Sequence, residues 1–144
     1  MNRDANRPLK RVILLVQATL LIIQFIVGMW INLFAPMNVP PPHGYFMMGY
    51  MMYYFSLIPA LAPHMAIGVA IGLLFLAMLV VALLSRDVIG AVLSTIGGVM
   101  TLVAGVAGMA FVAGGLSNNA LSMIMSVGFA SDLAVVVLML YLSA

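Results

Sequence analysis

The sequence predicts an all-α fold, a four-helix transmembrane bundle with a short Met- and Tyr-rich interfacial segment between the first and second crossings. Hydrophobic residues make up 66% of the chain and charged residues only 6%, which leaves too few polar side chains to cover a water-soluble surface. The length of 144 residues, at about 20 residues per crossing, allows roughly four helices and no sizeable soluble domain. Residues 1–144 are therefore expected to form a single integral membrane domain.

The first crossing is predicted at residues 12–34, an uninterrupted apolar run. Asp4 is the only acid before this run, whereas the basic residues before it are Arg3, Arg7, Lys10 and Arg11. A basic cluster of this kind stays on the cytoplasmic side of a membrane. The run is about 23 residues long, longer than the ~7–15 residues of a signal-peptide core, so the helix is expected to be retained.

A proline-rich stretch ends the first crossing, because the prolines at 36 and 40–42 lack the backbone N–H that a continuing helix needs. The following segment, residues 45–58, is apolar and dense in Met and Tyr, and prolines at 59 and 63 follow it. About 14 residues are too few for a crossing, and tyrosine rings favour the membrane interface. This segment is therefore expected to lie along the interface, with a re-entrant fifth segment as the alternative.

Three further crossings are predicted, at residues 64–84, 88–112 and 120–142. A polar turn that contains Arg86 and Asp87 separates the first two of them. If each earlier helix crosses the membrane once, Arg86 falls on the same side as the N-terminal basic cluster. The charges therefore predict that the N- and C-termini are both cytoplasmic.

Small residues are expected to mark the contacts between helices, because helices in lipid associate where their backbones can approach closely. In the third crossing, small side chains recur at alternating steps of three and four from Ser94 to Gly108. The glycines expected at helix contacts are Gly97, Gly98, Gly105 and Gly108 in this crossing and Gly68 and Gly72 in the preceding one.

Asp132 lies near the middle of the last predicted crossing, and no Lys, Arg or His is expected inside any crossing to pair with it. Burial in lipid disfavours a charged carboxylate, so the neutral form with a hydrogen-bonding partner is expected. Gln24 and Thr101 fall at about the same depth, and Gln17 lies seven residues before Gln24 on nearly the same face. Two interpretations stay open, an interhelical hydrogen bond that holds the bundle together and a site that handles protons or cations.

A second candidate site lies on the outer side of the membrane, where His43, Met47, Met51 and His64 are expected. In a helix Met47 and Met51 share a face, and His43 stands four residues before Met47. Thioether and imidazole groups suit Cu(I) and can also supply the axial ligands of a haem. The Met47-x-x-x-Met51 spacing resembles that of the Ctr-type copper transporters, and this resemblance, confined to residues 47–52, implies copper binding. The alternative interpretation is an apolar cover over the mouth of the bundle.

The first functional hypothesis is a small, non-enzymatic accessory or structural subunit, because the chain has too few polar groups for a self-sufficient catalyst. Such a subunit would pack against membrane-protein partners or a second copy, in a respiratory or transport assembly. The isoelectric point near 9.3 rests on a net charge of only +2, which does not predict nucleic-acid binding. An extracytoplasmic copper- or haem-binding protein and a proton-coupled small transporter that uses Asp132 are the alternatives.

Overall fold

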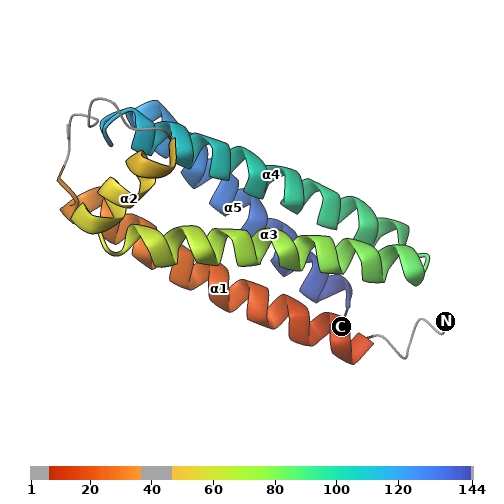
Figure 1. The fold of residues 1–144 in the computed structure, drawn as a ribbon. Coiled ribbons are helices and arrows are strands. Elements are labelled where there is room, and N and C mark those ends of the chain that lie inside the picture. The colour runs from red at the N-terminus through yellow and green to blue at the C-terminus, as the bar shows by residue number, and fades with distance from the viewer. Residues whose placement is uncertain (1–6, 37–46, 144) are drawn as a thin grey trace.

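Four long helices stand side by side in the computed structural model, and one short helix lies at one end of them (Figure 1). The structure describes residues 7–36 and 47–143, and no strand occurs in these two ranges. The helices are α1 (Arg7–Phe34), α2 (Met47–Leu57), α3 (Leu61–Leu84), α4 (Val88–Ala113) and α5 (Asn119–Leu142). The four long helices are each long and apolar enough to cross a membrane. The predicted all-α architecture with four apolar helices is thus confirmed.

Two helices begin earlier than the apolar runs indicate. α1 begins at Arg7 rather than at residue 12, and α3 begins at Leu61 rather than at residue 64. Pro8 and Pro63 both fall in the first turn of these helices, where the missing N–H has no intrahelical partner to lose. The proline before His64 therefore does not mark the start of the helix, and His64 lies about one turn inside it.

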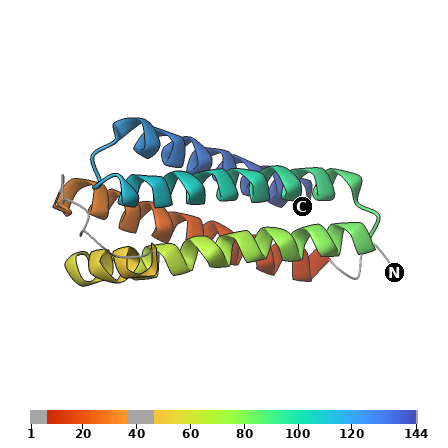
Figure 2. The same cartoon turned by 45° about the horizontal axis from the view of Figure 1, so that its top comes forward.

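The long helices form a closed ring in which α1 and α4 lie diagonally opposite each other. α1 packs against α3 and α5, and α4 packs against the same two helices. α1 and α4 both run away from the end where the two termini lie, while α3 and α5 run back towards it (Figure 1, Figure 2). Side chains at equal distances from the start of α1 and of α4 therefore lie at about the same level.

Each long helix turns a repeating row of residues to the interior. Along each helix the buried members recur mostly at steps of three and four, the spacing of left-handed helix bundles. They are Leu14, Gln17, Leu21 and Ile31 on α1, Leu61, Ile71, Phe75, Met78 and Ala82 on α3, Gly90, Ser94, Gly97, Ala107, Phe111 and Val112 on α4, and Gly128, Asp132, Val135, Val136 and Met139 on α5. The interior is thus apolar apart from Gln17, Ser94 and Asp132 among these residues.

Polar contacts fasten the end of the bundle where the termini lie, called the termini end below. Lys10 Nζ forms a 2.6 Å ion pair with Asp87 Oδ2, and Asp87 Oδ1 accepts a 2.9 Å hydrogen bond from the Gly90 N–H at the start of α4. Arg11 donates hydrogen bonds of 2.9 and 2.7 Å from Nε and Nη2 to the Ser143 carbonyl oxygen. The start of α1, the α3–α4 turn and the end of α5 are therefore held together.

The opposite end of the bundle is closed by α2 and the α4–α5 turn. Tyr54 and Ile58 are buried in one apolar cluster with Phe111 and Leu116. α4 ends in a Schellman motif, because the Leu116 N–H bonds the Phe111 carbonyl oxygen at 2.9 Å while Gly115 adopts a φ of 74°. A left-handed residue is needed at this position, and glycine adopts that conformation without steric cost.

Candidate intramembrane polar site

Polar residues of α1 and α4 face the interior at matching levels. Counted from the ion pair at the termini end, Gln17 and Ser94 lie seven residues further along the two helices, and Gln24 and Thr101 lie fourteen. Seven residues advance an α-helix by about 10.5 Å. Because α1 and α4 run in the same direction, the members of each pair fall at similar depths, the second pair near the middle of the bundle.

Asp132 is held by Thr101 across the contact between α4 and α5. The Thr101 hydroxyl donates a 2.7 Å hydrogen bond to Asp132 Oδ2, and Asp132 is only 3% exposed. Asp132 Oδ1 is also buried and has no hydrogen-bond partner among the described residues. One carboxyl oxygen is therefore held by a hydrogen bond, and the other is buried without a partner among the described residues.

The close approach of α4 and α5 that permits this bond depends on Gly128, one turn before Asp132. A Cβ atom at Gly128 would lie 2.8 Å from the Ala104 Cβ and 3.2 Å from the Met100 carbonyl oxygen. Any larger residue at Gly128 would push the two helices apart, since real Cβ contacts are wider than this. The absence of a side chain at Gly128 thus lets Asp132 come within hydrogen-bonding distance of Thr101.

Gln24 contacts His64 rather than Asp132. The two Nε2 atoms lie 3.3 Å apart; with the amide nitrogen as donor, the ring nitrogen accepts and the ring proton is on Nδ1. Neither His64 Nδ1 nor Gln24 Oε1 has a hydrogen-bond partner among the described residues. This pair joins α1 to α3 in the way that Thr101 and Asp132 join α4 to α5.

His64 lies near the end of the bundle that α2 closes, with its ring turned towards α1. Because α3 begins at Leu61, His64 occupies an interior position one turn into the helix. Its ring packs on Gly28 of α1, where a Cβ atom would lie 2.9 Å from His64 Cε1. Gly28 was not among the glycines expected at helix contacts, although it lies seven residues after the buried Leu21.

Gln17 is the most deeply buried polar residue of α1, with 0% of its surface exposed. Neither its amide nitrogen nor its amide oxygen has a hydrogen-bond partner among the residues that the structure describes. It lies on the face of α1 that carries Leu14 and Leu21, both members of the apolar core. A buried polar group left without a partner costs about 1–3 kcal/mol.

Two glycines of α3 lie beside the two hydrogen-bonded pairs, one glycine beside each pair. A Cβ atom at Gly68 would lie 3.3 Å from Gln24 Nε2, and one at Gly72 would lie 3.6 Å from Thr101 Cγ2. Gly68 and Gly72 are one turn apart, a rise of about 6 Å. The Gln24–His64 and Thr101–Asp132 pairs therefore meet α3 at adjacent turns.

The other glycines expected at helix contacts fall into three groups. Gly97 lies against the ring of Phe75, and Gly98 lies beside the Phe75 Cβ, which a Cβ atom there would approach to 3.8 Å. Gly108 faces α5, with 3.3 Å between an added Cβ atom and the Met125 sulfur. Gly105 faces outward, where an added Cβ atom would meet no described atom within 4 Å.

Three of the four proposed copper or haem ligands have side chains that lie outside the described part of the chain. His43 lies outside the described residues, and so do the side chains of Met47 and Met51, although α2 carries both methionines on its backbone. His64, the fourth candidate, faces Gln24 inside the bundle. Among the described residues, no group of three or more His, Cys, Asp or Glu side chains could hold a metal ion.

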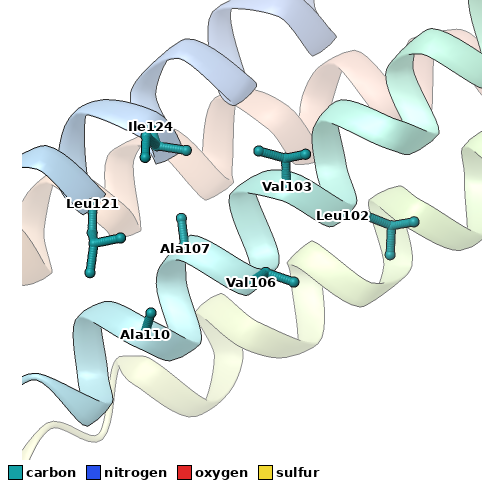
Figure 3. A pocket seen from close by; sticks show the side chains of 7 residues that line it. All are labelled: Leu102, Val103, Val106, Ala107, Ala110, Leu121 and Ile124. Atoms are coloured by element: carbon teal, nitrogen blue, oxygen red, sulfur yellow. The ribbon is translucent and has the colours of Figure 1, made fainter.

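A groove on the outside of α4 and α5 has a volume of about 390 Å³ and only apolar walls (Figure 3). Its lining residues are Leu102, Val103, Val106, Ala107, Ala110, Leu121 and Ile124. Ala107 and Ala110 leave the space open on the α4 side. With no polar group in its lining, this groove suits a lipid chain or an apolar helix and offers no chemistry.

Comparison with known protein families, with characterised proteins and with solved structures gives no match for this chain. The class of protein therefore follows from the structure: an all-helical bundle of four helices, each long and apolar enough to cross a membrane. Its distinguishing feature is a set of inward-facing polar residues, called the interior polar site below, which consists of Gln17, Gln24, His64, Thr101 and Asp132.

Proposed function

We propose that this protein is a small proton-coupled membrane transporter in which Asp132 takes up and releases the proton. The observation that carries the proposal is that Asp132 is buried in the interior with one carboxyl oxygen held by Thr101 and the other unpartnered. Burying a carboxyl group at this depth costs stability. Ionisable groups inside membrane helices commonly lie on ion or proton pathways.

The alternative explanation, interhelical hydrogen bonds that only hold the bundle together, accounts for the Thr101–Asp132 and Gln24–His64 contacts but not for the remaining polar atoms of the interior polar site. The buried atoms without a hydrogen-bond partner among the described residues are Gln17 Nε2, Gln17 Oε1, Gln24 Oε1, His64 Nδ1 and Asp132 Oδ1. At about 1–3 kcal/mol each, five such atoms would cost roughly 5–15 kcal/mol, as much as the net stability of a typical domain. Water molecules or a transported ion can supply the hydrogen bonds that these atoms need.

The order of the groups along the bundle supports a pathway from one end to the other. His64 lies in the first turn of α3, at the end closed by α2; Asp132 lies near the middle of α5; and Gln17 lies in the first half of α1, which begins at the termini end. His64 and Asp132 can each gain and lose a proton, whereas the glutamine amides can orient water between them. In this mechanism a proton passes from His64 to Asp132 through water and leaves past Gln17.

The charges of the chain support a cytoplasmic position for the termini end. The described basic residues all lie there, and they are Arg7, Lys10, Arg11 and Arg86. Loops and ends that carry an excess of Lys and Arg stay on the cytoplasmic side of a bilayer. The proton pathway then connects an outer end at α2 with a cytoplasmic end at the termini.

Proton flux into vesicles tests the proposal. The purified protein is reconstituted into liposomes that enclose a pH-sensitive dye, and a potassium gradient with valinomycin supplies the driving potential. We expect wild-type vesicles to acidify faster than empty ones and Asp132→Asn vesicles to match empty ones, because asparagine can still accept the bond from Thr101 but cannot carry a proton.

Asp87→Asn is the matched control, because it removes the same charge at the termini end and keeps an oxygen that can cap α4. Its vesicles are expected to acidify at the wild-type rate. Wild-type vesicles that acidify no faster than empty ones, or Asp132→Asn vesicles that acidify at the wild-type rate, would refute the proton-coupled mechanism.

A second candidate function, an accessory subunit that packs against another membrane protein, is favoured by the groove on α4 and α5. Its walls are apolar, and the small side chains of Ala107 and Ala110 are among them, which are features that let another helix approach. The chain contains no cysteine, so a single Ala110→Cys substitution gives an unambiguous cross-linking site. Cross-linking in native membranes to one defined protein supports this function, whereas an uncross-linked chain argues against it.

A further inference from the structure

A pocket of about 440 Å³ opens at the termini end, between the start of α1, the α3–α4 turn and the end of α5. We call it the termini pocket. Lys10 and Asp87, which form the 2.6 Å ion pair, line it near the ends of the helices. Leu14, Met78 and Met139 line it further inside. The termini pocket therefore reaches from the end of the bundle to the edge of its apolar core.

Three apolar side chains from three helices close the termini pocket on its inner side. Leu14 of α1, Met78 of α3 and Met139 of α5 are the buried side chains among its lining residues, exposed to 1%, 1% and 5%. All three belong to one buried apolar cluster, so they pack together across the interior. We call these three residues the inner apolar layer.

Gln17 lies one turn beyond the inner apolar layer. It follows Leu14 by three residues on α1, is 0% exposed and does not line the termini pocket. Both atoms of its amide lack a hydrogen-bond partner among the described residues. An amide that water would satisfy is thus separated from the termini pocket by a single layer of apolar side chains.

Asp132 lies beyond the inner apolar layer as well. It precedes Met139 by seven residues on α5, which places it about 10.5 Å further from the termini end, and both residues face the interior. A proton that leaves Asp132 towards the termini end therefore has to pass the inner apolar layer. Narrow apolar constrictions exclude water and conduct only when they become wet.

We propose that the inner apolar layer is the gate at the termini end of the pathway, which in its closed state keeps the water of the termini pocket from Gln17 and Asp132. This role rests on the proposed function, because a gate is needed only where protons pass. The two methionines suit a gate, since an unbranched side chain with three rotatable bonds can change its shape within a packed interior. A polar side chain in the layer would hold water there and keep the gate open.

The reaction of a buried thiol with a water-soluble reagent tests the proposal. The chain contains no cysteine, so Ser94→Cys introduces a single thiol. Ser94 is 1% exposed and lies four residues after Gly90, a lining residue of the termini pocket, at the level of Gln17. The detergent-purified full chain is mixed with 2-aminoethyl methanethiosulfonate, a small charged reagent, and the labelled fraction is followed over time by mass spectrometry.

Met78→Gln in the Ser94→Cys chain is expected to speed labelling about tenfold, the ratio that one added hydrogen bond to water supplies. Glutamine is unbranched and close to methionine in length, so the layer keeps its packing while it gains a polar group. Met125→Gln is the matched control, because Met125 packs against the apolar cluster at the opposite end of the bundle and does not line the termini pocket. This control is expected to leave the labelling rate unchanged.

Three results would overturn the gate. They are an unchanged rate in Met78→Gln, an equal acceleration by Met125→Gln, and labelling of Ser94→Cys alone as fast as that of Ile89→Cys, whose side chain lines the termini pocket. If Met78→Gln does not fold, Met139→Gln gives the same comparison. Labelling does not depend on flux, so vesicles that fail to acidify refute the proton-coupled mechanism, whereas a labelling rate that does not respond to the layer refutes the gate.

Discussion

Two adjacent glycines of α4 should respond in opposite ways to the same substitution. Gly97 receives the ring of Phe75 from α3, and a Cβ atom built at Gly97 would overlap that ring, with Cδ1 at 2.7 Å and Cε1 and Cζ closer still. At Gly98 the nearest atom is the Phe75 Cβ at 3.8 Å, an ordinary van der Waals contact. The methyl group of an alanine would therefore overlap the Phe75 ring at position 97 and make an ordinary contact with the Phe75 Cβ at position 98.

The expected size of each effect follows from these contacts. Gly97→Ala forces the fully buried Phe75 ring to move within a packed interior, and overpacking of this kind costs about 1–3 kcal/mol. Gly98→Ala meets no such obstacle and gains helix propensity, so it should stabilise the protein by up to about 1 kcal/mol. Since both variants gain the same propensity, the difference between them isolates the overlap with Phe75.

The measurement is reversible unfolding in mixed micelles, followed by circular dichroism, on the wild type and the two variants. Phe75→Leu provides a further check, because a leucine side chain is smaller than the ring, and the Gly97→Ala/Phe75→Leu double variant should lose less stability than the two single variants predict by addition. If Gly97→Ala is as stable as Gly98→Ala, the close contact between α3 and α4 described for Gly97 is wrong.

Three further substitutions, one at Thr101 and two at Asp87, test the polar contacts in the same unfolding assay. Thr101→Val removes the donor to Asp132 Oδ2 and should cost about 1–3 kcal/mol, because a second buried carboxyl oxygen then lacks a partner among the described residues; an unchanged midpoint would argue against the 2.7 Å bond. Asp87→Ala removes the cap of α4 and the ion pair with Lys10 together and should cost about 1–2 kcal/mol, mostly from the cap, whereas Asp87→Asn should lose only the smaller part. Equal losses in the two Asp87 variants would show that the cap contributes nothing.

The long helices could be predicted from the sequence because their signal is local. An apolar run of about 20 residues must form a helix in lipid, whatever its neighbours are. Helices α1 and α3 begin before the predicted crossings for a local reason as well, since charged residues and prolines end the apolar runs but not the helices. Pro63 belongs to the first turn of α3, and a proline in a first turn is compatible with the helix that follows.

The interior polar site could be predicted only in part, because it depends on the register between helices. The depth of Gln24, Thr101 and Asp132 was available from residue counts, but their partners were not. Because α3 begins at Leu61, three residues before the predicted crossing, His64 lies one turn inside the helix, where it contacts Gln24. The row of steps of three and four through Leu14, Gln17 and Leu21 is the signal in the sequence that could have indicated how deeply Gln17 is buried.

The polar caps at the two ends of the bundle are hydrogen-bonded, and so is the buried Ser94, whose hydroxyl donates to the Gly90 carbonyl oxygen at 2.7 Å; Gln17 and Asp132 differ from them. Asp87 caps α4 and pairs with Lys10 at the termini end, and Asn118 caps α5 at the other end by accepting from the Ala120 and Leu121 N–H groups. In the interior, Gln17 and Asp132 are more deeply buried than these two caps, yet each has atoms that lack a partner among the described residues. A polar residue retained only for stability would be expected to have its bonds satisfied where burial makes an unmade bond most costly. The unbonded atoms of Gln17 and Asp132 are the reason for our proposal that the interior polar site exchanges hydrogen bonds with water and protons.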